Sequence, residues 1–242
     1  MRAALALAAA LPLASAAEPA RLVAFSSATP GSTLPSGWRE LVPPRVKPPR
    51  FDLVDDGGVT VLRVTSADAA GTVAQDLRVG LAAHPVLAWR WKVDRVLAGA
   101  DLGTKRGDDF AARVYVFFDV PAAALPLAAR IELAVARLLY GASLPSAAIC
   151  YVWDNRHAPG TSRWSPYTDR VRMVVLESGP DRAGQWVAER RDLAADYRDA
   201  FGERAPLHDA SGVAAGNDTD QTGETATAWF GDFRLSAPEG TR

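Results

Sequence analysis

The sequence predicts a mainly β protein, built as an antiparallel β-sandwich of the jelly-roll type, with a β-barrel as the alternative architecture. Three observations predict this class. Many short segments alternate apolar and polar residues with period two, Gly, Pro, Asn and Asp separate these segments, and only two stretches have helical periodicity. The 242-residue chain has a single cysteine, Cys150, so no intrachain disulfide can form and the hydrophobic core must provide the stability.

Residues 1–17 are typical of a secretory signal peptide. Arg2 supplies a positive charge, an apolar Ala/Leu run follows, and Ala14-Ser15-Ala16 provides the small residues of a cleavage site. The apolar run is too short to cross a bilayer, which takes about 20 residues. We therefore expect a periplasmic or secreted protein without a transmembrane segment, in which residues 18–242 form one β-sandwich domain.

Residues 28–49 contain the phrase PPRVKPPR and are expected to form a Pro-rich extended surface segment. The strands that follow are predicted in the phrases GGVTVLRVTSA, PVLAWRWKVDR, DDFAARVYVFFDV, AAICYVWDN, RVRMVVLESG, GQWVAERRD and ATAWFGDFRL. In PVLAWRWKVDR the predicted core face is Leu87, Trp89, Trp91 and Val93. In DDFAARVYVFFDV it is Phe110, Ala112, Val114, Val116 and Phe118, opposite Arg113, Tyr115 and Phe117.

Two stretches have helical patterns. The first, PLAARIELAVARLLYG (residues 126–141), places Ile131, Val135, Leu138 and Leu139 on one stripe and predicts a helix of about three to four turns. The second, residues 192–202, predicts a shorter helix with Asp192 as its N-cap and Gly202 at its C-terminal end. Both helices are expected in connections between strands.

The loop after the AAICYVWDN strand is a candidate ligand-binding segment. It gathers amide, guanidinium and indole groups, which suit a sugar because the hydroxyls need directional partners and the apolar sugar face stacks on aromatic rings. An ordinary surface loop anchored by its tryptophan is equally consistent with the pattern. The candidate ligand-binding residues here are Trp153, Asn155, His157, Trp164 and Tyr167.

A second candidate surface lies on the polar faces of the strands. If one sheet is concave, a cationic and aromatic groove suited to an acidic glycan is formed by Arg90, Arg113 and Tyr115, with Lys92, Phe117, Tyr151 and Trp153 nearby. The alternative, which we favour, is structural. In that interpretation Phe117, Tyr151 and Trp153 pack beneath the helices, and the arginines pair with Asp94 and Asp119.

The first half of the phrase GNDTDQTGETATAWFGDFRL is rich in side-chain oxygens that could bind a metal ion, and its second half is a predicted strand. An EF-hand is excluded, because placing Gly223 at the pivotal position puts Trp229 where a bidentate glutamate is required. A looser calcium site that uses Asp218 and Asp220 stays open. A polar turn that enters the last strand is the interpretation we favour.

Catalytic signals are sparse in this sequence. The chain has three histidines, and its sequence contains neither a G-x-S-x-G motif nor an H-E-x-x-H motif. The acids considered for glycoside hydrolysis are Asp108, Asp109, Glu177 and Glu189. Adjacent residues of a strand point to opposite faces, so Asp108 and Asp109 are not expected to act together. The sequence does not identify a catalytic residue.

Five phrases together resemble an exported bacterial family known as domain of unknown function 3047. They are WRWKV, DDFAARVYVFFD, YVWDN, RRDLAADYRDAFG and NDTDQTGETATAWFGDFRL. The resemblance implies a secreted or periplasmic β-rich protein, and it assigns no activity and no catalytic residue. The last phrase is also similar, over a short length, to the closing strand of jelly-roll carbohydrate-binding modules.

The function we predict is non-catalytic binding of a glycan or another cell-envelope component. One alternative is a polysaccharide lyase or glycoside hydrolase on the same scaffold, with Tyr115 or His157 as a base beside Arg113. Another is a structural envelope protein that binds a second protein. The net charge of −1 argues against a nucleic-acid partner, and no cofactor other than calcium is considered.

Overall fold

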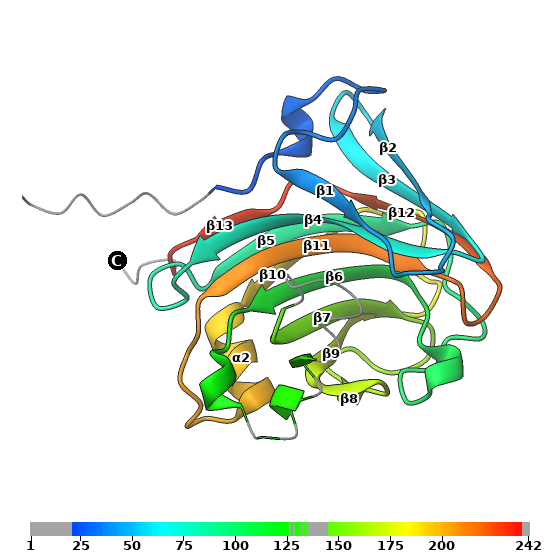
Figure 1. Ribbon diagram of the computed structural model, residues 1–242. Coiled ribbons are helices and arrows are strands. Elements are labelled where there is room, and N and C mark those ends of the chain that lie inside the picture. The colour runs from blue at the N-terminus through cyan, green and yellow to red at the C-terminus, as the bar shows by residue number, and fades with distance from the viewer. Residues whose placement is uncertain (1–20, 126, 128, 132, 135–144, 239–242) are drawn as a thin grey trace, which may run out of the picture.

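The computed structural model describes residues 21–238 except 126, 128, 132 and 135–144. Two β-sheets pack face to face, and the strands of each are strongly curved (Figure 1). The predicted signal peptide lies outside the described residues. Within the described residues, no helix is long and apolar enough to cross a membrane.

The first sheet has seven strands in the order β1-β4-β11-β6-β7-β9-β8. Their bounds are β1 Trp38–Leu41, β4 Ala70–Val79, β11 Ala210–Asp218, β6 Phe110–Phe118, β7 Ala147–Asp154, β9 Thr168–Ser178 and β8 Ser162–Ser165. Every pair is antiparallel except β7 with β9, which run parallel. The prediction of a purely antiparallel sandwich is therefore wrong at this one pair, because the chain leaves β7 and returns through β8 before β9.

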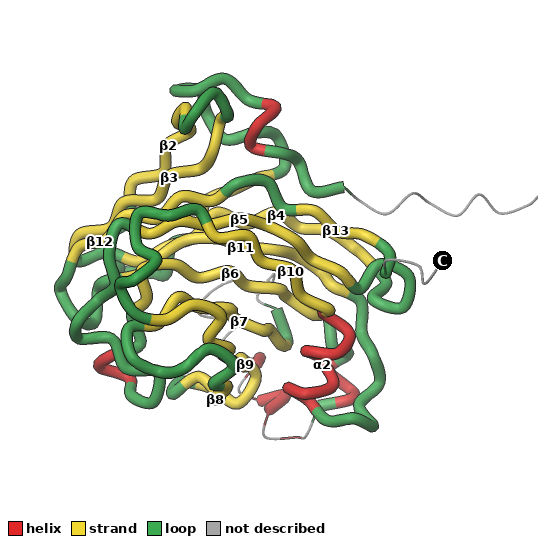
Figure 2. Tube along the Cα trace, turned by 180° about the vertical axis from the view of Figure 1, so that it is seen from behind, coloured by secondary structure: helices red, strands yellow, loops and turns green. Residues whose placement is uncertain are grey.

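The second sheet follows the order β10-β5-β12-β3-β2, and β13 pairs with β5 beyond the end of β12. Its strands are β10 Val187–Asp192, β5 Val86–Val93, β12 Thr225–Phe230, β3 Thr60–Ala67, β2 Arg50–Asp55 and β13 Arg234–Ser236. The view from behind shows β5, β10 and β12 of this sheet (Figure 2). The mainly β class with two sheets, predicted from period-two patterns, is confirmed.

The core lies between the sheets and takes one face of each strand. In β5 the residues Leu87, Trp89, Trp91 and Val93 are all buried there, as the alternation predicts. The Trp89 ring lies 5.7 Å from that of Trp91 and 5.5 Å from that of Tyr151. Tyr151 and Trp153 belong to this core, so both are structural residues of the sandwich. Such aromatic pairs add stability beyond the area they bury.

The β6 strand contains a β-bulge that the alternation does not reveal. Its register with β11 shifts between the pairs Gly216–Arg113 and Asp218–Phe110, so β6 carries one extra residue there. Ala111 and Ala112 both face the core as a result. Phe110 turns to the outer face of the sheet, where it packs with Cys150. The prediction that Phe110 shares the core face of Ala112 is therefore wrong.

The shorter predicted helix is present as α2 (Leu193–Phe201), beside one end of the sandwich (Figure 1). Asp192 caps it, because its Oδ1 accepts hydrogen bonds from Ala194 N at 2.9 Å and Ala195 N at 3.0 Å. Gly202, with φ 106°, ends the helix as expected. Three short 3-10 helices lie at Phe25–Ser27, Lys105–Gly107 and Ala122–Ala124.

The longer predicted helix, over residues 126–141, falls mostly outside the described residues. Of its predicted apolar stripe, Ile131 is described and is exposed. The Pro-rich segment 28–49 is extended over part of its length, and it contributes the edge strand β1, which pairs with β4. Sequence alternation did not reveal β1 because the strand has only four residues.

Candidate functional site

The outer face of the seven-stranded sheet carries a groove of about 690 Å³. Its floor comes from β4, β6 and β11, and it is flanked by the loop that follows β1 and by the turn between β8 and β9. The alternation of β6 places Arg113, Tyr115 and Phe117 on this outer face, and the bulge adds Phe110 to it. The residues that line this groove include Pro43, Pro44, Arg113, Tyr115, Phe117 and Tyr167.

Aromatic rings line the groove. Tyr115 and Phe117 alternate along β6, and their rings stack with centroids 5.9 Å apart at an angle of 24°. Tyr167, in the β8–β9 turn, is 54% exposed. Its hydroxyl donates a hydrogen bond to the carbonyl of Lys105 at 3.0 Å, which fixes the ring at the groove wall. The groove therefore offers partly exposed π-faces held in place by the backbone.

Arg113 is buried at the inner end of the groove and is held by carboxylates. Its Nε donates to Asp218 Oδ1 at 2.7 Å, and its Nη2 lies 2.7 Å from Asp218 Oδ2 and 3.3 Å from Asp108 Oδ1. Nη2 also donates to the carbonyl of Asp108, and Nη1 donates to the Tyr115 hydroxyl at 3.1 Å. The guanidinium lies 4.7 Å from the Phe110 ring centroid. These contacts occupy all three guanidinium nitrogens.

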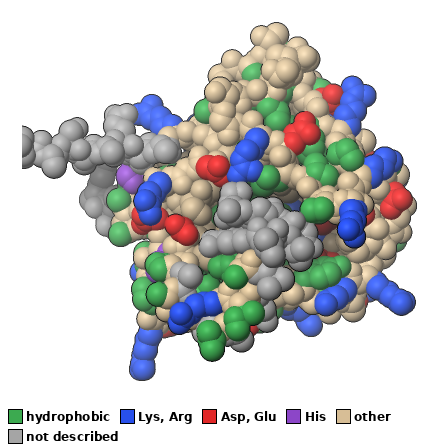
Figure 3. Space-filling view, in the orientation of Figure 1, with side chains coloured by type: hydrophobic (Ala, Val, Ile, Leu, Met, Phe, Trp, Pro, Cys, Tyr) green, Lys and Arg blue, Asp and Glu red, His purple; other side chains and the backbone are tan. Residues whose placement is uncertain are grey.

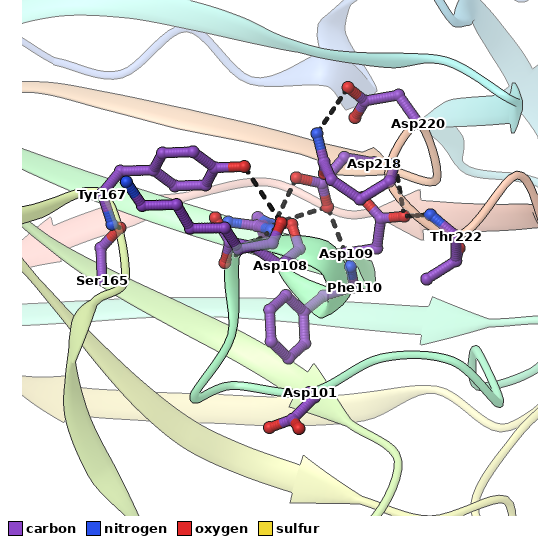
Figure 4. A network of polar contacts seen from close by, with 12 residues as sticks. Asp101, Asp108, Asp109, Phe110, Ser165, Tyr167, Asp218, Asp220 and Thr222 are labelled. Carbon is purple, nitrogen blue, oxygen red and sulfur yellow. Dashed lines mark hydrogen bonds and ion pairs between the residues drawn. The ribbon is translucent and has the colours of Figure 1, made fainter.

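Two further carboxylates complete this acidic cluster (Figure 4). Asp109 is fully buried, and its Oδ2 accepts hydrogen bonds from Gln221 N at 3.0 Å and Thr222 N at 2.6 Å. Asp220 accepts a 2.6 Å hydrogen bond from the Gln221 side chain. Asp109 stands just before β6, so the rule of opposite strand faces does not apply to it. Asp108 and Asp109 therefore belong to one acidic cluster, and the prediction that they do not act together as catalytic acids stays a prediction.

Burial and the charges of neighbouring carboxylates both change the pKa values of the acids in this cluster. Burial raises the pKa of Asp108, Asp218 and Asp220, and neighbouring carboxylates add to the rise in each case. Arg113 lowers the pKa of all three. Burial also raises the pKa of the Tyr115 hydroxyl well above its usual value. These acids therefore hold their protons more tightly than free aspartates do.

The polar phrase before the last long strand forms the turn between β11 and β12. Thr219 N donates to the carbonyl of Ala69 at 2.9 Å, and Gly223, with φ 69°, donates to the carbonyl of Thr219 at 2.9 Å. Asn217 is buried and donates to the carbonyls of Val64 and Ala226. The interpretation as a polar turn entering a strand therefore agrees with the structure, and the same turn also presents Asp218 and Asp220.

The structure distributes the predicted ligand-binding residues over several places. Arg113, Tyr115 and Tyr167 share the groove. Arg90 lies on the outer face of the other sheet, with its guanidinium 4.4 Å from the Trp186 ring centroid. Trp153 lies in the core, where it is 1% exposed.

The other three predicted residues are also held outside the groove. Asn155 donates hydrogen bonds to the carbonyls of Ala98 and Ala100. His157 Nδ1 lies 3.2 Å from Asp154 Oδ2. Trp164 packs against Phe201 of α2, with ring centroids 5.8 Å apart. The expected pairing of the arginines with Asp94 and Asp119 is wrong for Arg113, whose carboxylate partners are Asp108 and Asp218.

The other two acids considered from the sequence, Glu177 and Glu189, come together at a different place. Both lie at the open edge where β9 of one sheet faces β10 of the other, and Glu177 accepts a 2.7 Å hydrogen bond from Arg182. Burial, and next the charge of Glu177, raise the pKa of Glu189 to about 7. Trp91 Nε1 donates to Glu189 at 3.1 Å.

The sequence did not reveal two parts of the site, one in the acidic cluster and one in the groove wall. Phe110 and the Asp108–Asp109 pair join the site only because of the bulge and the turn before β6. The wall from Val42 to Pro44 joins because β1 pairs with β4. No spacing rule signals either feature. The sequence predicted an extended segment around Pro43-Pro44, but it did not reveal that this segment lies beside β4.

Solved structures resemble this chain in outline. The xyloglucanase domain of NopAA, a type three effector from Sinorhizobium fredii in complex with cellobiose, has 11% identity and a TM-score of 0.46, covering 87% of this chain and 97% of that one. Endoglucanase cel12A from Rhodothermus marinus has 10% identity and a TM-score of 0.45, covering 84% and 92%. A family 30 carbohydrate-binding module from Clostridium thermocellum has 12% identity and a TM-score of 0.41, covering 92% and 99%.

Among curated proteins, none matches the chain. One family model does match, over residues 36–234, which includes every strand from β2 to β12 and the whole of the groove. The five phrases that resembled the same family lie within these residues, apart from the last residue of the fifth phrase. The chain therefore belongs to the family described as "Protein of unknown function (DUF3047)".

Proposed function

We propose that this protein binds an uncharged glycan in the groove on the outer face of the seven-stranded sheet, without catalysis. The observation that carries the proposal is the stacked Tyr115–Phe117 pair beside the exposed Tyr167 ring. Sugar rings present apolar C–H faces that pack on such π-faces. The groove volume of about 690 Å³ suits a ligand of a few sugar units.

Electrostatics favour a neutral ligand over an acidic one. Arg113, the guanidinium in the groove lining, already contacts Asp108 and Asp218, and its side chain is only 6% exposed. A uronate would have to displace one of these carboxylates and approach the others. The acidic glycan considered from the sequence is therefore less suitable than an uncharged one.

A lyase mechanism at this groove has little support. A lyase base must lose its proton readily, whereas burial raises the pKa of Tyr115. His157, the other candidate base, lies against Asp154 and does not line the groove. Burial also raises the pKa of Asp218, but its two oxygens are held by Arg113 and Phe110 N. These contacts support binding without bond cleavage.

A structural role through a protein partner is supported less well. The large exposed hydrophobic residues among those described are few and lie in three separate parts of the chain, at Val59, at Leu127 and Ile131, and at Trp164 and Tyr167. On the face in Figure 3, acidic and basic side chains are interspersed. That mixture does not suit a nucleic-acid partner, which usually requires a basic surface.

The test is a thermal melt of residues 18–242 with a panel of soluble neutral and uronate-containing polysaccharides. A ligand at 100 times its dissociation constant stabilises by about 2.7 kcal/mol, a rise of roughly 5–10 °C for a domain of this size. We expect the rise with a neutral glycan. Tyr167→Ala should reduce it more than Tyr167→Phe, because phenylalanine keeps the stacking ring and loses only the hydroxyl bond to Lys105.

Three outcomes would overturn parts of this proposal. No rise with any neutral glycan rejects it, and an equal rise with the Tyr167→Ala variant places the ligand elsewhere. A reducing-end assay on the glycan that binds decides the catalytic question, because new reducing ends would establish cleavage.

Export is a separate proposal, and N-terminal sequencing of the protein from the periplasm or medium should find a start near residue 18.

A further inference from the structure

We propose that Asp109, Asp218 and Asp220 bind a calcium ion beside the groove. One carboxylate oxygen from each residue lies within 4.8 Å of the other two. Figure 4 shows the three residues near one another, although Asp109 precedes β6, Asp218 is the last residue of β11 and Asp220 lies in the turn that follows. Oxygens at this spacing can share one cation.

The second observation is an unpaired oxygen on Asp109. This side chain is 0% exposed, and its Oδ1 has no hydrogen-bond partner, although Oδ2 accepts from Gln221 N and Thr222 N. A buried carboxylate oxygen without a partner costs free energy, because it has lost its hydration. A cation between the three acids would provide the partner that the protein does not.

Thr222 adds a neutral oxygen at the same place. Its Oγ1 is also buried without a hydrogen-bond partner, and its backbone N–H binds Asp109. The turn therefore brings a hydroxyl and carboxylates to the same end of β11. A hydroxyl and water molecules are common additional ligands of a calcium ion, which takes six to eight oxygens.

The balance of charges in the cluster also favours a bound cation. Asp108, Asp109, Asp218 and Asp220 are four acids, and Arg113 is the cation that contacts them. Arg113 contacts Asp108 and Asp218. No described ion pair supplies Asp109 or Asp220 with a cationic partner. A divalent ion among the oxygens of Asp109, Asp218 and Asp220 would balance the two acids that have no ion pair with the guanidinium.

The ligand chemistry selects calcium among common cations. All the candidate ligands are hard oxygens, whereas zinc prefers histidine nitrogen and cysteine sulfur. Magnesium needs near-ideal octahedral geometry and keeps most of its water. Calcium accepts the irregular arrangement that a strand end and a turn provide. The ion would fasten the β11–β12 turn to the start of β6, independently of any glycan.

The direct test is titration calorimetry on residues 18–242 after a chelator has removed bound metal. Calcium chloride is titrated first and magnesium chloride in a second experiment, both in the absence of glycan. We expect one calcium ion to bind per chain and the melting temperature to rise by roughly 5–10 °C at 100 times the dissociation constant. Asp220→Asn should weaken calcium binding at least tenfold. It keeps the side-chain shape and an oxygen that can accept the Gln221 hydrogen bond.

Asp101→Asn is the matched control, because Asp101 lies near the cluster but points away from it (Figure 4). This variant should bind calcium as the unaltered protein does. No binding of calcium, or equal binding by the Asp220→Asn variant, would overturn the proposal. Tighter binding of magnesium than of calcium would overturn the choice of ion. Because no glycan is present, these results are independent of the proposed glycan binding.

Discussion

Arg113 and Asp218 form a two-point ion pair across neighbouring strands, with Nε to Oδ1 and Nη2 to Oδ2 both at 2.7 Å. Arg113 lies in β6 and Asp218 ends β11. Alternation along β6 places Arg113 on the outer face, and the β6 bulge turns Phe110 to that same face beside it. The ion pair connects the aromatic groove to the proposed calcium site, and it explains why this guanidinium is not free to bind an acidic ligand.

Replacing Arg113 with methionine should lower the free energy of unfolding by about 3–5 kcal/mol, because it leaves buried carboxylates without their cation. Urea denaturation in the presence of a chelator measures this change without a contribution from calcium. The Arg113→Met, Asp218→Asn double variant should be more stable than the sum of the two single effects predicts. Strict additivity would show that the two side chains are not energetically coupled.

Glu189 should make stability depend on pH. Its pKa is about 7 in the folded protein, above its value of 4.5 in an unfolded chain, so the folded state holds the proton more tightly. Its contribution is therefore present below about pH 4.5 and is lost as pH rises through about 7. Melting curves between these pH values should show Glu189→Gln declining less steeply than the unaltered protein. The Glu203→Gln variant, at an exposed position, is the control and should leave the slope unchanged.

Gly216 should not tolerate a side chain. A Cβ atom there would lie 2.2 Å from the carbonyl oxygen of Gly71 and 2.7 Å from the Cα of Thr72, both on the paired strand β4. Gly216→Ala should therefore destabilise the protein by about 1–3 kcal/mol or prevent folding. At Gly80 the nearest atom would be 3.7 Å away, so Gly80→Ala is the matched control and should change stability little. Equal melting temperatures for the two variants would contradict this packing.

Cys150 should be unreactive in the folded protein. The thiol is buried, and burial raises its pKa to about 12, so the reactive thiolate is scarce. At pH 8 a disulfide reagent such as dithionitrobenzoate should label the native protein far more slowly than the protein in guanidinium chloride. Rapid labelling of the native protein would show that the sheet opens on the time scale of the assay.

The residues within one strand or one helix were predictable because their patterns are local. The alternation of β5 places Leu87 and Trp89 in the core, and Asp192 and Gly202 bound α2 as expected. Each of these features depends on neighbours within a few positions. The backbone period and the capping hydrogen bonds fix them whatever the rest of the chain does.

The groove and the acidic cluster depend on how distant strands pair. One extra residue in β6 turns Phe110 outward, although the alternating pattern alone predicts that it faces inward. Asp109 binds the backbone of Gln221, 112 positions further along the chain. No local pattern carries such a contact, because it follows from the register of β6 against β11.

The sequence by itself therefore determined the β class, the core faces of the regular strands, the capped helix and the family. Only the tertiary structure decided that Arg113 shares a groove with Tyr167, that Arg90 faces away on the other sheet, and that Trp153 lies in the core. The reason is physical. Side-chain direction within a strand follows from a two-residue period, whereas proximity between strands follows from pairing, bulges and curvature that involve the whole chain.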